Sequence, residues 1–543
     1  MVMHQTADVT SYPLGSIADL WRERVSMDRD SLFIQFLDGA KLPENDVYAG
    51  RTQIVTYGDV DDLAQKVRDA LAEVGASVNT RILLHMGNGL PFVMSFLGVT
   101  MTGATVVPTI ELSTQQELEY TIHDSECAAV VVEVTHREKA EEICRRLNVP
   151  LLLVQDDGSL SWIISNDRGN PETEPRAATQ AQPDDVAMIM YTSGTTNLPK
   201  GVMLSHRSLV FAAEMNAQQM RLSKRDRMLC TLPLFHANAL IFHFLGSIST
   251  GSDMVVTRRF SVKAYWNIAR AYRITIGNLS GETLRLLLRE PPKKTDQDLC
   301  MDRMLFGMPL TNDEVLAIQS RFGIVLAHHW GLTEVAGAAT RSSFYRGELP
   351  GDNAIGQVCP GYRVRIMRED GKLADFGEPG ELQVAGIGVM IGYWKRPEAT
   401  AETLEGEWLR TGDIGSIDIH GNVRFQGRLK DVIKVKGENV AALEVEKVIR
   451  NIPSISNVAV VGRRDDVYGE APVAYVVLAD GSSLTADAVR KHCEEHLSSF
   501  KIPHEIHLIA ELPVTSVGKV RKAELAKWAA DGYTGTPPRL NAN

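Results

Sequence analysis

The first third of the chain alternates between short apolar runs and longer amphipathic segments. The runs expected to form strands are residues 81–89, 105–109, 126–134 and 150–155. The segments with helical spacing of apolar positions are residues 91–104 and 136–148. Continuous apolar runs are typical of strands buried on both faces, as in a parallel sheet. The alternation therefore predicts an α/β fold, with helices covering a parallel sheet.

The pattern changes at about Gly351. Residues 356–394 are rich in glycine and contain short alternating strands, and "EDGK" at 369–372 is typical of a hairpin turn. This region is expected to form a small antiparallel β element. Beyond Lys430 the chain is mixed again, with helices expected at 444–452 and 485–497 and strands expected at 458–466 and 471–480. This last piece is long enough to be a domain of its own.

Composition and charge narrow the function classes. The 543 residues favour several domains, and 44% hydrophobic with 23% charged residues is an ordinary globular balance. A net charge of -11 argues against a nucleic-acid groove, because phosphate backbones are held by Lys and Arg. A local basic pocket for one phosphorylated small molecule remains compatible with this charge.

The cysteines and the apolar segments indicate the compartment. Six scattered cysteines form no C-x-x-C pair, which argues against a disulfide framework or a zinc site. The N-terminal residues lack a signal-peptide pattern, and the apolar runs are too short to span a bilayer. These features predict a soluble cytoplasmic protein without integral membrane contact.

The segment "YTSGTTNLPKGV" at 191–202 concentrates hydroxyl groups beside a lysine. Its candidate phosphate-binding residues are Thr192, Ser193, Gly194, Thr195, Thr196 and Lys200. Hydroxyls and backbone N–H groups around a glycine form a concave donor surface suited to an anion. The segment is not a Walker A loop, and taken alone it could equally be an ordinary strand-to-helix connection.

Six further motifs accompany this segment. They are "LPLFH", "HHWGLTE", "YWKRPEAT", "LRTGDIG", "GRLKDVIKVKGENV" and "PVTSVGKVRK". With these motifs in this order, nearly the whole chain resembles the adenylate-forming enzymes, which include acyl-CoA ligases, adenylation domains and luciferases. Within that superfamily the sequence looks closest to the carnitine/crotonobetaine-CoA ligase-like acyl-CoA synthetases.

The resemblance implies a division of the chain. Residues 1–429 would form the large N-terminal adenylation domain, with stacked α/β subdomains at 1–350 and a small β-barrel-like subdomain at 351–429. Residues 430–543 would form a small mobile α+β domain. Lys430 falls at the family's hinge position, so the small domain would adopt two poses and one site would serve two half-reactions.

The resemblance also implies how ATP and Mg²⁺ are bound. The Ser/Thr-rich loop would close over the β- and γ-phosphates, although Asn197 stands where the family usually has Gly. Glu334 would ligate Mg²⁺, which prefers hard oxygen ligands. Trp330 replaces the Tyr that stacks near adenine, with Gly331 and Thr333 beside the nucleotide.

Further roles follow from the later motifs. Asp413 would accept hydrogen bonds from the ribose, and Arg428 would contact the ribose and phosphates. Lys519 matches the catalytic lysine of adenylation, where an ammonium meets the charge developing on the α-phosphate. Lys436 and Gly437 would face the site in the second pose, in which coenzyme A receives the acyl group.

The acyl pocket can be outlined in part. The residues expected there are His236, Gly281, Glu282, Phe306, Gly307, Met308 and His329. Phe306-Gly307-Met308 replaces the usual Gly-Gly-Ala, and Phe306 is expected to add bulk that disfavours a long acyl chain. Glu282 is either a partner for a substrate amine or a solvated carboxylate. His328 and His329 are either packed histidines or substrate contacts.

The resulting prediction is an acid–thiol ligase that activates a small or aryl carboxylic acid as acyl-AMP and transfers it to coenzyme A. An alternative is a ligase-like diazotase that activates nitrite for an arylamine, since the nucleotide motifs do not separate the two. A nucleotide-binding protein without turnover is disfavoured by the presence of Glu334, Asp413, Arg428 and Lys519. A homodimer is a further expectation without an identifiable interface.

Overall fold

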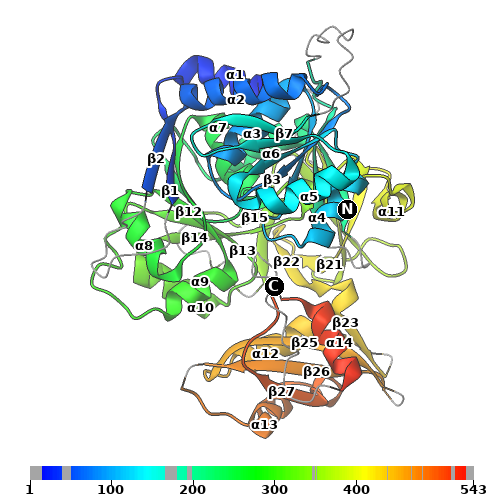
Figure 1. Cartoon of the computed structure of the whole chain (residues 1–543). Coiled ribbons are helices and arrows are strands. Elements are labelled where there is room, and N and C mark those ends of the chain that lie inside the picture. The colour runs from blue at the N-terminus through cyan, green and yellow to red at the C-terminus, as the bar shows by residue number, and fades with distance from the viewer. Residues whose placement is uncertain are drawn as a thin grey trace. The chain divides into compact units, whose positions relative to one another are not determined.

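The chain packs as two units, residues 1–364 with 384–410 and residues 365–383 with 411–543. The computed structural model describes residues 15–38, 51–165, 180–192, 199–344, 349, 351, 353–436, 438–465, 468–479, 481–514 and 520–532. In Figure 1 the chain is coloured from its N-terminus to its C-terminus. The hinge expected at Lys430 stays a prediction, since the units are defined by packing alone.

The first unit contains a sheet with the strand order β19-β9-β8-β4-β3-β5-β6-β7. These strands are β3 Arg81–His85, β4 Thr105–Thr109, β5 Ala129–Glu133, β6 Leu151–Val154, β7 Leu160–Ile164, β8 Val186–Thr192, β9 Lys200–Ser205 and β19 Gly392–Tyr393. Strands β4, β3, β5 and β6 pair in parallel, and they confirm the expected strand-helix alternation. The intervening helices are α3 Leu90–Thr102, α4 Gln115–Ser125 and α5 Arg137–Leu147, with the 3-10 turn η1 Val134–His136.

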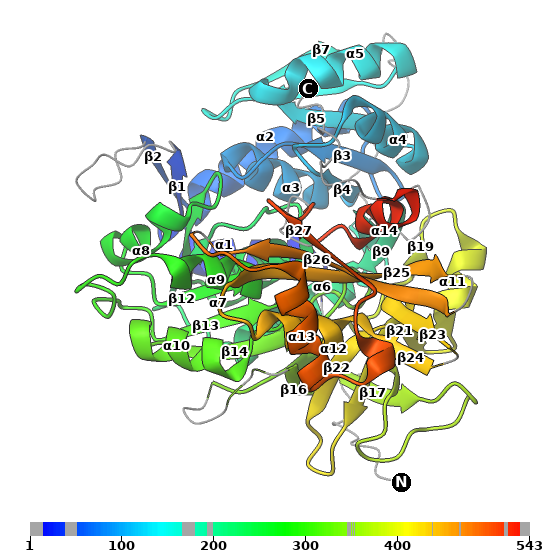
Figure 2. The same ribbon diagram turned by 90° about the horizontal axis from the view of Figure 1, so that it is seen from below.

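The second sheet of this unit has the order β16-β15-β14-β13-β12-β10-β11-β1-β2. Its strands are β1 Leu32–Asp38, β2 Arg51–Thr56, β10 Arg227–Cys230, β11 Asp253–Thr257, β12 Ile276–Ser280, β13 Arg303–Gly307, β14 Val325–Trp330, β15 Thr340–Arg341 and β16 Ala354–Val358. Its helices and turns are α1 Ile17–Asp28, α2 Tyr57–Ala72, α6 His206–Gln219, η2 Asn238–Leu245, α7 Gly246–Thr250, α8 Val262–Ala271, α9 Gly281–Arg289, α10 Asn312–Phe322 and η3 Thr333–Val335. Figures 1 and 2 both show α8, α9 and α10 beside β12, β13 and β14. An apolar cluster that includes Leu279, Phe306 and Phe322 fills that side.

Local sequence signals explain where several helices begin. The helices α1, α2, α4 and α10 each start with a capping box, in which a Ser or Thr and an acidic residue three positions later satisfy each other's backbone N–H groups. At the other end, α3 stops at Gly103, whose φ of 81° lies in the left-handed region that glycine adopts without strain. The capping boxes set where four helices begin, and Gly103 sets where α3 ends, shortly before β4 begins at Thr105.

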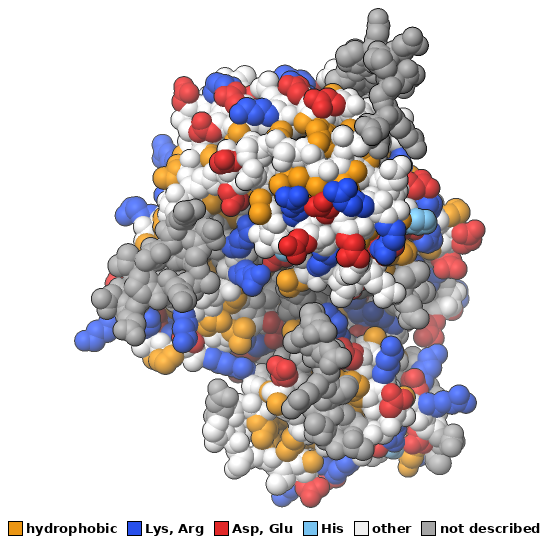
Figure 3. Space-filling model, viewed as in Figure 1, with side chains coloured by type: hydrophobic (Ala, Val, Ile, Leu, Met, Phe, Trp, Pro, Cys, Tyr) orange, Lys and Arg blue, Asp and Glu red, His pale blue; other side chains and the backbone are white. Residues whose placement is uncertain are grey.

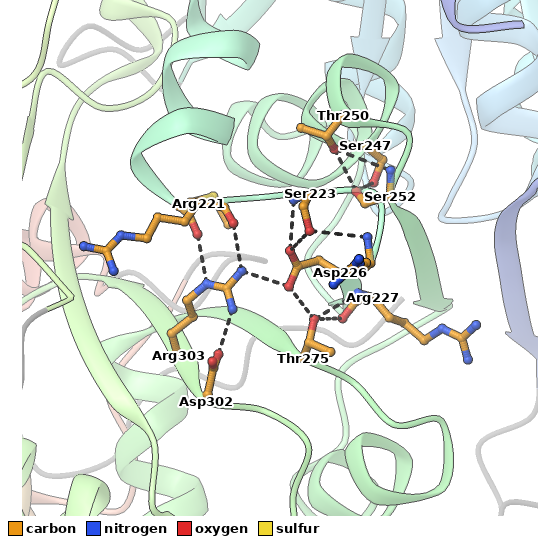
Figure 4. A network of polar contacts seen from close by, with 12 residues as sticks. Arg221, Ser223, Asp226, Arg227, Ser247, Thr250, Ser252, Thr275, Asp302 and Arg303 are labelled. Atoms are coloured by element: carbon orange, nitrogen blue, oxygen red, sulfur yellow. Dashed lines mark hydrogen bonds and ion pairs between the residues drawn. The ribbon is translucent and has the colours of Figure 1, made fainter. Parts of the chain in front are cut away.

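A polar network pins the amino-terminal ends of three strands in the second sheet (Figure 4). Arg303 on β13 donates to Asp226 over 2.8 Å, and Thr275, just before β12, donates to the same carboxylate over 2.8 Å. Asp226 directly precedes β10 and also accepts from Ser223. The network holds β10, β12 and β13 in register, while the expected pocket residues of β12 to β14 lie toward their carboxyl ends.

The second unit contains a five-stranded sheet with β24, β23, β26 and β25 in that order and β27 beside β26. Its elements are β23 Val432–Val435, β24 Glu438–Ala441, α12 Ala442–Arg450, β25 Ile455–Asp465, β26 Gly469–Leu478, α13 Ala486–His496, η5 Ser499–Lys501, β27 Glu505–Ile509 and α14 Lys522–Asp531. The helices and strands expected after residue 430 are thereby confirmed. An apolar cluster that includes Val445 and Val460 packs between α12 and this sheet.

The remaining strands run through or close to the boundaries of the units. They are β17 Tyr362–Met367, β18 Gly380–Gly386, β21 Trp408–Ile417 and β22 Val423–Arg428, which are neighbours in that order. The short elements nearby are α11 Pro397–Thr403, β20 Leu404–Glu405 and η4 Leu429–Asp431. The expected hairpin turn is present, because Arg368 and Lys372 bond through their backbones and Gly371 has a φ of 77°.

Two further features are the distribution of charge on the surface and the apolar character of the helices. Basic and acidic side chains are interspersed on the face seen in Figure 3, so the net charge is not concentrated in one area of that face. Within the described residues, no helix has the length and apolar character needed to cross a bilayer.

Candidate active site

The two ends of the phosphate-loop motif lie on adjacent antiparallel strands. Thr192 ends β8, Lys200 begins β9, and the two are paired residues of the antiparallel ladder. Ser193, Gly194, Thr195 and Thr196 lie outside the described residues. The Lys200 ammonium lies 5.1 Å from the centroid of the Tyr393 ring, a cation–π contact.

Tyr393 connects this lysine to the predicted metal ligand. Its hydroxyl donates to the Glu334 carboxylate over 3.0 Å, while the backbone N–H of Met390 donates to the Glu334 carbonyl over 2.8 Å. Burial and the neighbouring Glu334 carboxylate raise the pKa of Tyr393, which keeps the phenol neutral and donating. Sequence reasoning did not single out Tyr393, although it begins the quoted motif "YWKRPEAT".

The loop after β14 holds the predicted nucleotide residues in a tight turn. A Cβ on Gly331 would lie 1.5 Å from the Gly337 carbonyl oxygen, so only glycine fits there. The backbone N–H of Ala339 donates to the Trp330 carbonyl over 3.0 Å, and the Tyr362 hydroxyl donates to the Val335 carbonyl over 2.7 Å. These bonds close both ends of the turn that carries Thr333 and Glu334.

These residues fit ATP and Mg²⁺. A lysine and a carboxylate converge on one tyrosine, and a carboxylate oxygen is the ligand that Mg²⁺ prefers. Trp330 is 8% exposed and offers an aromatic face, while Gly331 allows close approach of the backbone. Bound Mg²⁺ would offset phosphate charge, and Lys200 would add a second positive group.

Strand alternation divides the expected acyl-pocket residues between two faces of the second sheet. Phe306 and His328 are paired residues of β13 and β14 and stack with ring centroids 4.7 Å apart. Phe306 is fully buried in the cluster with α8 to α10. Gly307 and His329, one position further along each strand, point to the opposite face, where a Cβ on Gly307 would lie 3.2 Å from His329 Nε2.

The expectation that Phe306 adds bulk to the acyl pocket therefore needs correction. It packs in the apolar core, on the face opposite Gly307 and His329. His328 is one of the packed histidines: its Nδ1 lies 2.9 Å from the Ala354 carbonyl, and burial lowers its pKa to about 4. His328 is therefore neutral at physiological pH.

On the face of the second sheet opposite Phe306, His329 ends a chain of hydrogen-bonded amide groups. Asn278 donates to Asn238 Oδ1 over 2.5 Å, and Asn238 Nδ2 lies 3.4 Å from His329 Nε2. The ring of His329 meets Phe242 edge-on at 4.9 Å. Burial, together with the nearby positive charge of Arg341, holds the pKa of His329 well below its ordinary value, so the imidazole is neutral. Its Nε2 then accepts from Asn238 and its Nδ1 carries the proton.

The other expected pocket residues lie around this chain. His236 precedes η2, and its Nδ1 accepts from the backbone N–H of Asn238 over 3.3 Å. Gly281 begins α9, where a Cβ would lie 2.5 Å from the carbonyl oxygen of Met308. Met308 has a φ of 71°, an uncommon conformation for a residue with a side chain. Glu282 binds Arg285 over 2.8 Å, so its charge is already compensated within the protein.

In the second unit, Asp413 and Arg428 are paired residues of β21 and β22. Arg428 Nε lies 3.1 Å from Asp413 Oδ1, and Asp413 is 2% exposed. Lys430 lies in η4, and the Lys436 ammonium lies 4.5 Å from the centroid of the Tyr468 ring. Gly437 and Lys519 lie outside the described residues.

Comparisons with known proteins agree with these features. The AMP-binding enzyme family matches residues 37–394, and the AMP-binding enzyme C-terminal domain matches residues 444–519. The sulfoacetate–CoA ligase of Cupriavidus necator is 32% identical, over 88% of this chain and 92% of that protein. The crotonobetaine/carnitine–CoA ligase of Salmonella arizonae is 29% identical, over 88% and 94%.

Solved structures give the same picture. ATP-bound MatB from Rhodopseudomonas palustris has a TM-score of 0.83 and 26% identity, covering 94% of this chain and 98% of that one. The anthranilate CoA ligase AuaEII with anthranoyl-AMP shares the fold, with a TM-score of 0.81, 23% identity and coverage of 96% and 99%. The class so defined is that of ATP-dependent ligases that activate an acid as its acyl-AMP. The chain belongs to the AMP-binding enzyme family. As an AMP-forming acid–thiol ligase, it uses ATP and coenzyme A.

Proposed function

We propose that this ligase activates a compact carboxylic acid, small and polar or aryl, and transfers its acyl group to coenzyme A in the cytoplasm. The observation that carries the proposal is the polar chain from Asn278 on β12 through Asn238 on η2 to His329 near the carboxyl end of β14. Two polar atoms of this chain, Asn278 Oδ1 and His329 Nδ1, are buried without a hydrogen-bond partner among the described residues. A long alkyl chain would leave them unpaired, which costs free energy. A short polar or aryl acid can approach them with polar atoms.

The names of the relatives support a compact substrate, but they do not agree on a single acid. Sulfoacetate carries a second anionic group, whereas carnitine carries a quaternary ammonium, and the two ligases are similarly distant from this chain. The charge preference must therefore be sought in this chain's own residues. None of the relatives named above is a diazotase, and the nitrite alternative has no support among them.

The proposed residue roles follow the order of the reaction. Lys200, the loop at 193–198 and Glu334 with Mg²⁺ would hold the phosphates, and Trp330 would stack on adenine. Asp413 and Arg428 would hold the ribose, and Lys519 would stabilise the transition state of adenylation. Lys430 would be the hinge, with Lys436 and Gly437 serving the thioester step. His236 would guide the substrate carboxylate.

The test is AMP formation from ATP and Mg²⁺ with a panel of short aliphatic, hydroxylated, anionic and aryl acids, with and without coenzyme A. We expect AMP with one acid class, a hydroxamate when hydroxylamine traps the adenylate, and a thioester by mass when coenzyme A is present. A chain that prefers acyl groups longer than about eight carbons would contradict the proposal. So would AMP formed only with nitrite and an arylamine and unaffected by coenzyme A.

A further inference from the structure

Arg341 is a buried cation without an acidic partner in the described part of the chain. It lies on β15 and is 5% exposed. Its guanidinium donates to the side-chain oxygen of Asn216 and, over 3.5 Å, to the Asn216 carbonyl, and it lies 5.6 Å from the centroid of the Phe242 ring. Each of these partners is neutral. A buried charge held only by neutral groups is costly, because water has been removed and no opposite charge replaces it.

Cys359 is the titratable neighbour whose ionised form would favour the charged guanidinium. Burial raises the pKa of the Cys359 thiol to about 11, so it is neutral at physiological pH. Burial also lowers the pKa of Arg341, which is the direction expected for a cation without a counter-ion. The positive charge of Arg341 is thus not compensated by any residue that the structure describes.

His329 lies directly across the ladder from Arg341. The two are paired residues of β14 and β15, so their side chains project on the same face as close neighbours. His329 Nδ1 and Arg341 Nε are both buried and have no hydrogen-bond partner among the described residues. Buried donors of this kind are rare in folded proteins, and two adjacent ones need an explanation.

These donors lie next to the strand ends that form the proposed acyl site. Arg341 is ten residues beyond Gly331, and β15 returns antiparallel to β14 after the loop that carries Glu334. Two glycines pack closely against this cluster: a Cβ on Gly307 would lie 3.2 Å from His329 Nε2, and a Cβ on Gly337 would lie 3.2 Å from Phe242 and 3.6 Å from Asn216 Nδ2. A side chain at either glycine would crowd the cluster.

We propose that Arg341 and His329 form a subsite for a second anionic group of the substrate, a carboxylate or a sulfonate, on the acid whose other carboxylate is adenylated. Arg341 supplies the compensating charge through Nε and the guanidinium edge, and His329 supplies a neutral N–H donor through Nδ1. Charge-assisted bonds to a guanidinium are strong and directional, so the subsite selects the second anion rather than tolerating it. This inference rests on the proposed function, because it names the substrate class of the same site.

The experiment measures binding as well as turnover, with pairs of acids in which a methyl ester or a methyl sulfone removes the second charge. The pairs are sulfoacetate with (methylsulfonyl)acetate, malonate with monomethyl malonate, succinate with monomethyl succinate, and isophthalate with its monomethyl ester. Calorimetric Kd values are determined for each member, and AMP formation is followed in parallel. We expect the dianionic member of at least one pair to bind at least tenfold more tightly than its monoanionic partner.

Arg341→Met removes the charge while keeping an unbranched side chain. Arg341→Lys keeps the charge but lacks the planar guanidinium with its several N–H donors. We expect Arg341→Met to abolish the preference, with dianion binding at least 100-fold weaker and the Kd for ATP changed less than threefold. Arg341→Lys should retain part of the preference. The matched control is Arg303→Met, which removes a guanidinium paired with Asp226 at the amino-terminal end of β13 and should leave the preference unchanged.

Each outcome is decisive for one proposal or the other. Equal binding of both members of every pair, or a preference that Arg341→Met and Arg303→Met change alike, would overturn the subsite. Tight dianion binding that depends on Arg341 but gives neither AMP nor thioester would support the subsite and refute the proposed ligase substrate. Turnover confined to monoanionic acids would refute the subsite and leave the ligase function standing.

Discussion

The hydroxyl of Tyr393 donates to the carboxylate of Glu334 over 3.0 Å, while the same ring faces the ammonium of Lys200 at 5.1 Å. Two groups of opposite charge, 134 positions apart in the sequence, are thereby oriented by one side chain from a third segment. We therefore expect Tyr393 to act as a positioning residue for Glu334, the proposed metal ligand.

Tyr393→Phe should weaken Mg²⁺-dependent adenylation. A hydrogen bond to a charged group contributes about 1.5–3 kcal/mol, so we expect AMP formation at limiting Mg²⁺ to fall about 10- to 100-fold. Excess Mg²⁺ should restore part of the rate, which a general loss of structure would not allow. The control is Tyr265→Phe, which removes a buried hydroxyl with no hydrogen-bond partner among the described residues. An unchanged Mg²⁺ dependence in Tyr393→Phe would refute the positioning role.

Lys519→Ala should separate the two half-reactions. Loss of a group that stabilises developing charge typically costs about 10²–10³ in rate, so acid-dependent ATP–pyrophosphate exchange should fall by that factor. Thioester formation from supplied acyl-adenylate and coenzyme A should change less than threefold, because the proposed role of Lys519 is confined to adenylation. Lys527→Ala, an exposed lysine on α14, is the matched control. Equal losses in both half-reactions would rule out the assigned role.

Gly331→Ala should damage both stability and adenylation. The added methyl would lie 1.5 Å from the Gly337 carbonyl oxygen, a backbone atom that moves only if the turn carrying Thr333 and Glu334 shifts. Overpacking of this kind costs about 1–3 kcal/mol, and we expect AMP formation to fall at least about tenfold. Gly246→Ala meets nothing closer than 3.5 Å and should be neutral. Melting curves and AMP assays of both variants make the comparison.

The stability contributed by His136 should be lost at alkaline pH. Contacts with Glu111 and Glu133 raise the pKa of His136 to about 9, above its ordinary value of 6.5. The stabilisation is therefore complete below pH 6.5 and disappears as pH rises through about 9. Although burial opposes it, contact with His136 and Arg258 lowers the pKa of Glu133 to about 2, so Glu133 stays ionised throughout this range.

The measurement is the melting temperature of wild type and His136→Gln between pH 6 and pH 10. The charged or titratable groups around the ring are Glu111, Glu133, Arg258, His85 and Lys139. We expect wild type to melt about 2 °C higher than the variant at pH 6 and the two to converge by pH 10. A difference that grows with pH would contradict the assignment.

The strands and helices of the first sheet could be read from the sequence because they depend on local apolar runs. Residues 105–109 were expected to form a strand, and β4 has these bounds. The family motifs identified Glu334 and Lys200 for a similar reason, since each is recognised from its immediate neighbours.

The features that the sequence did not reveal depend on which face of a sheet a residue occupies and on contacts between residues far apart in the chain. Phe306 was misplaced because β12, β13 and β14 are buried on both sides, so hydrophobicity does not indicate which face a residue occupies. Arg341 was missed because its isolation is visible only when Asn216 and Phe242, from two other elements, are seen around it. The π-helical turn at Asn238–Leu245 likewise gave no recognisable local signal.

The chain passes between the two packing units three times, at residues 364/365, 383/384 and 410/411, and this limits how the protein can be cut. No single break in the backbone yields two intact pieces. A polypeptide ended at Arg410 would lose β22 and most of β21, and β18 would be left with β17 alone as a neighbour. One ended at Leu429 would keep all four strands from β17 to β22 named above, so 429 is the better terminus for preparing the N-terminal part alone.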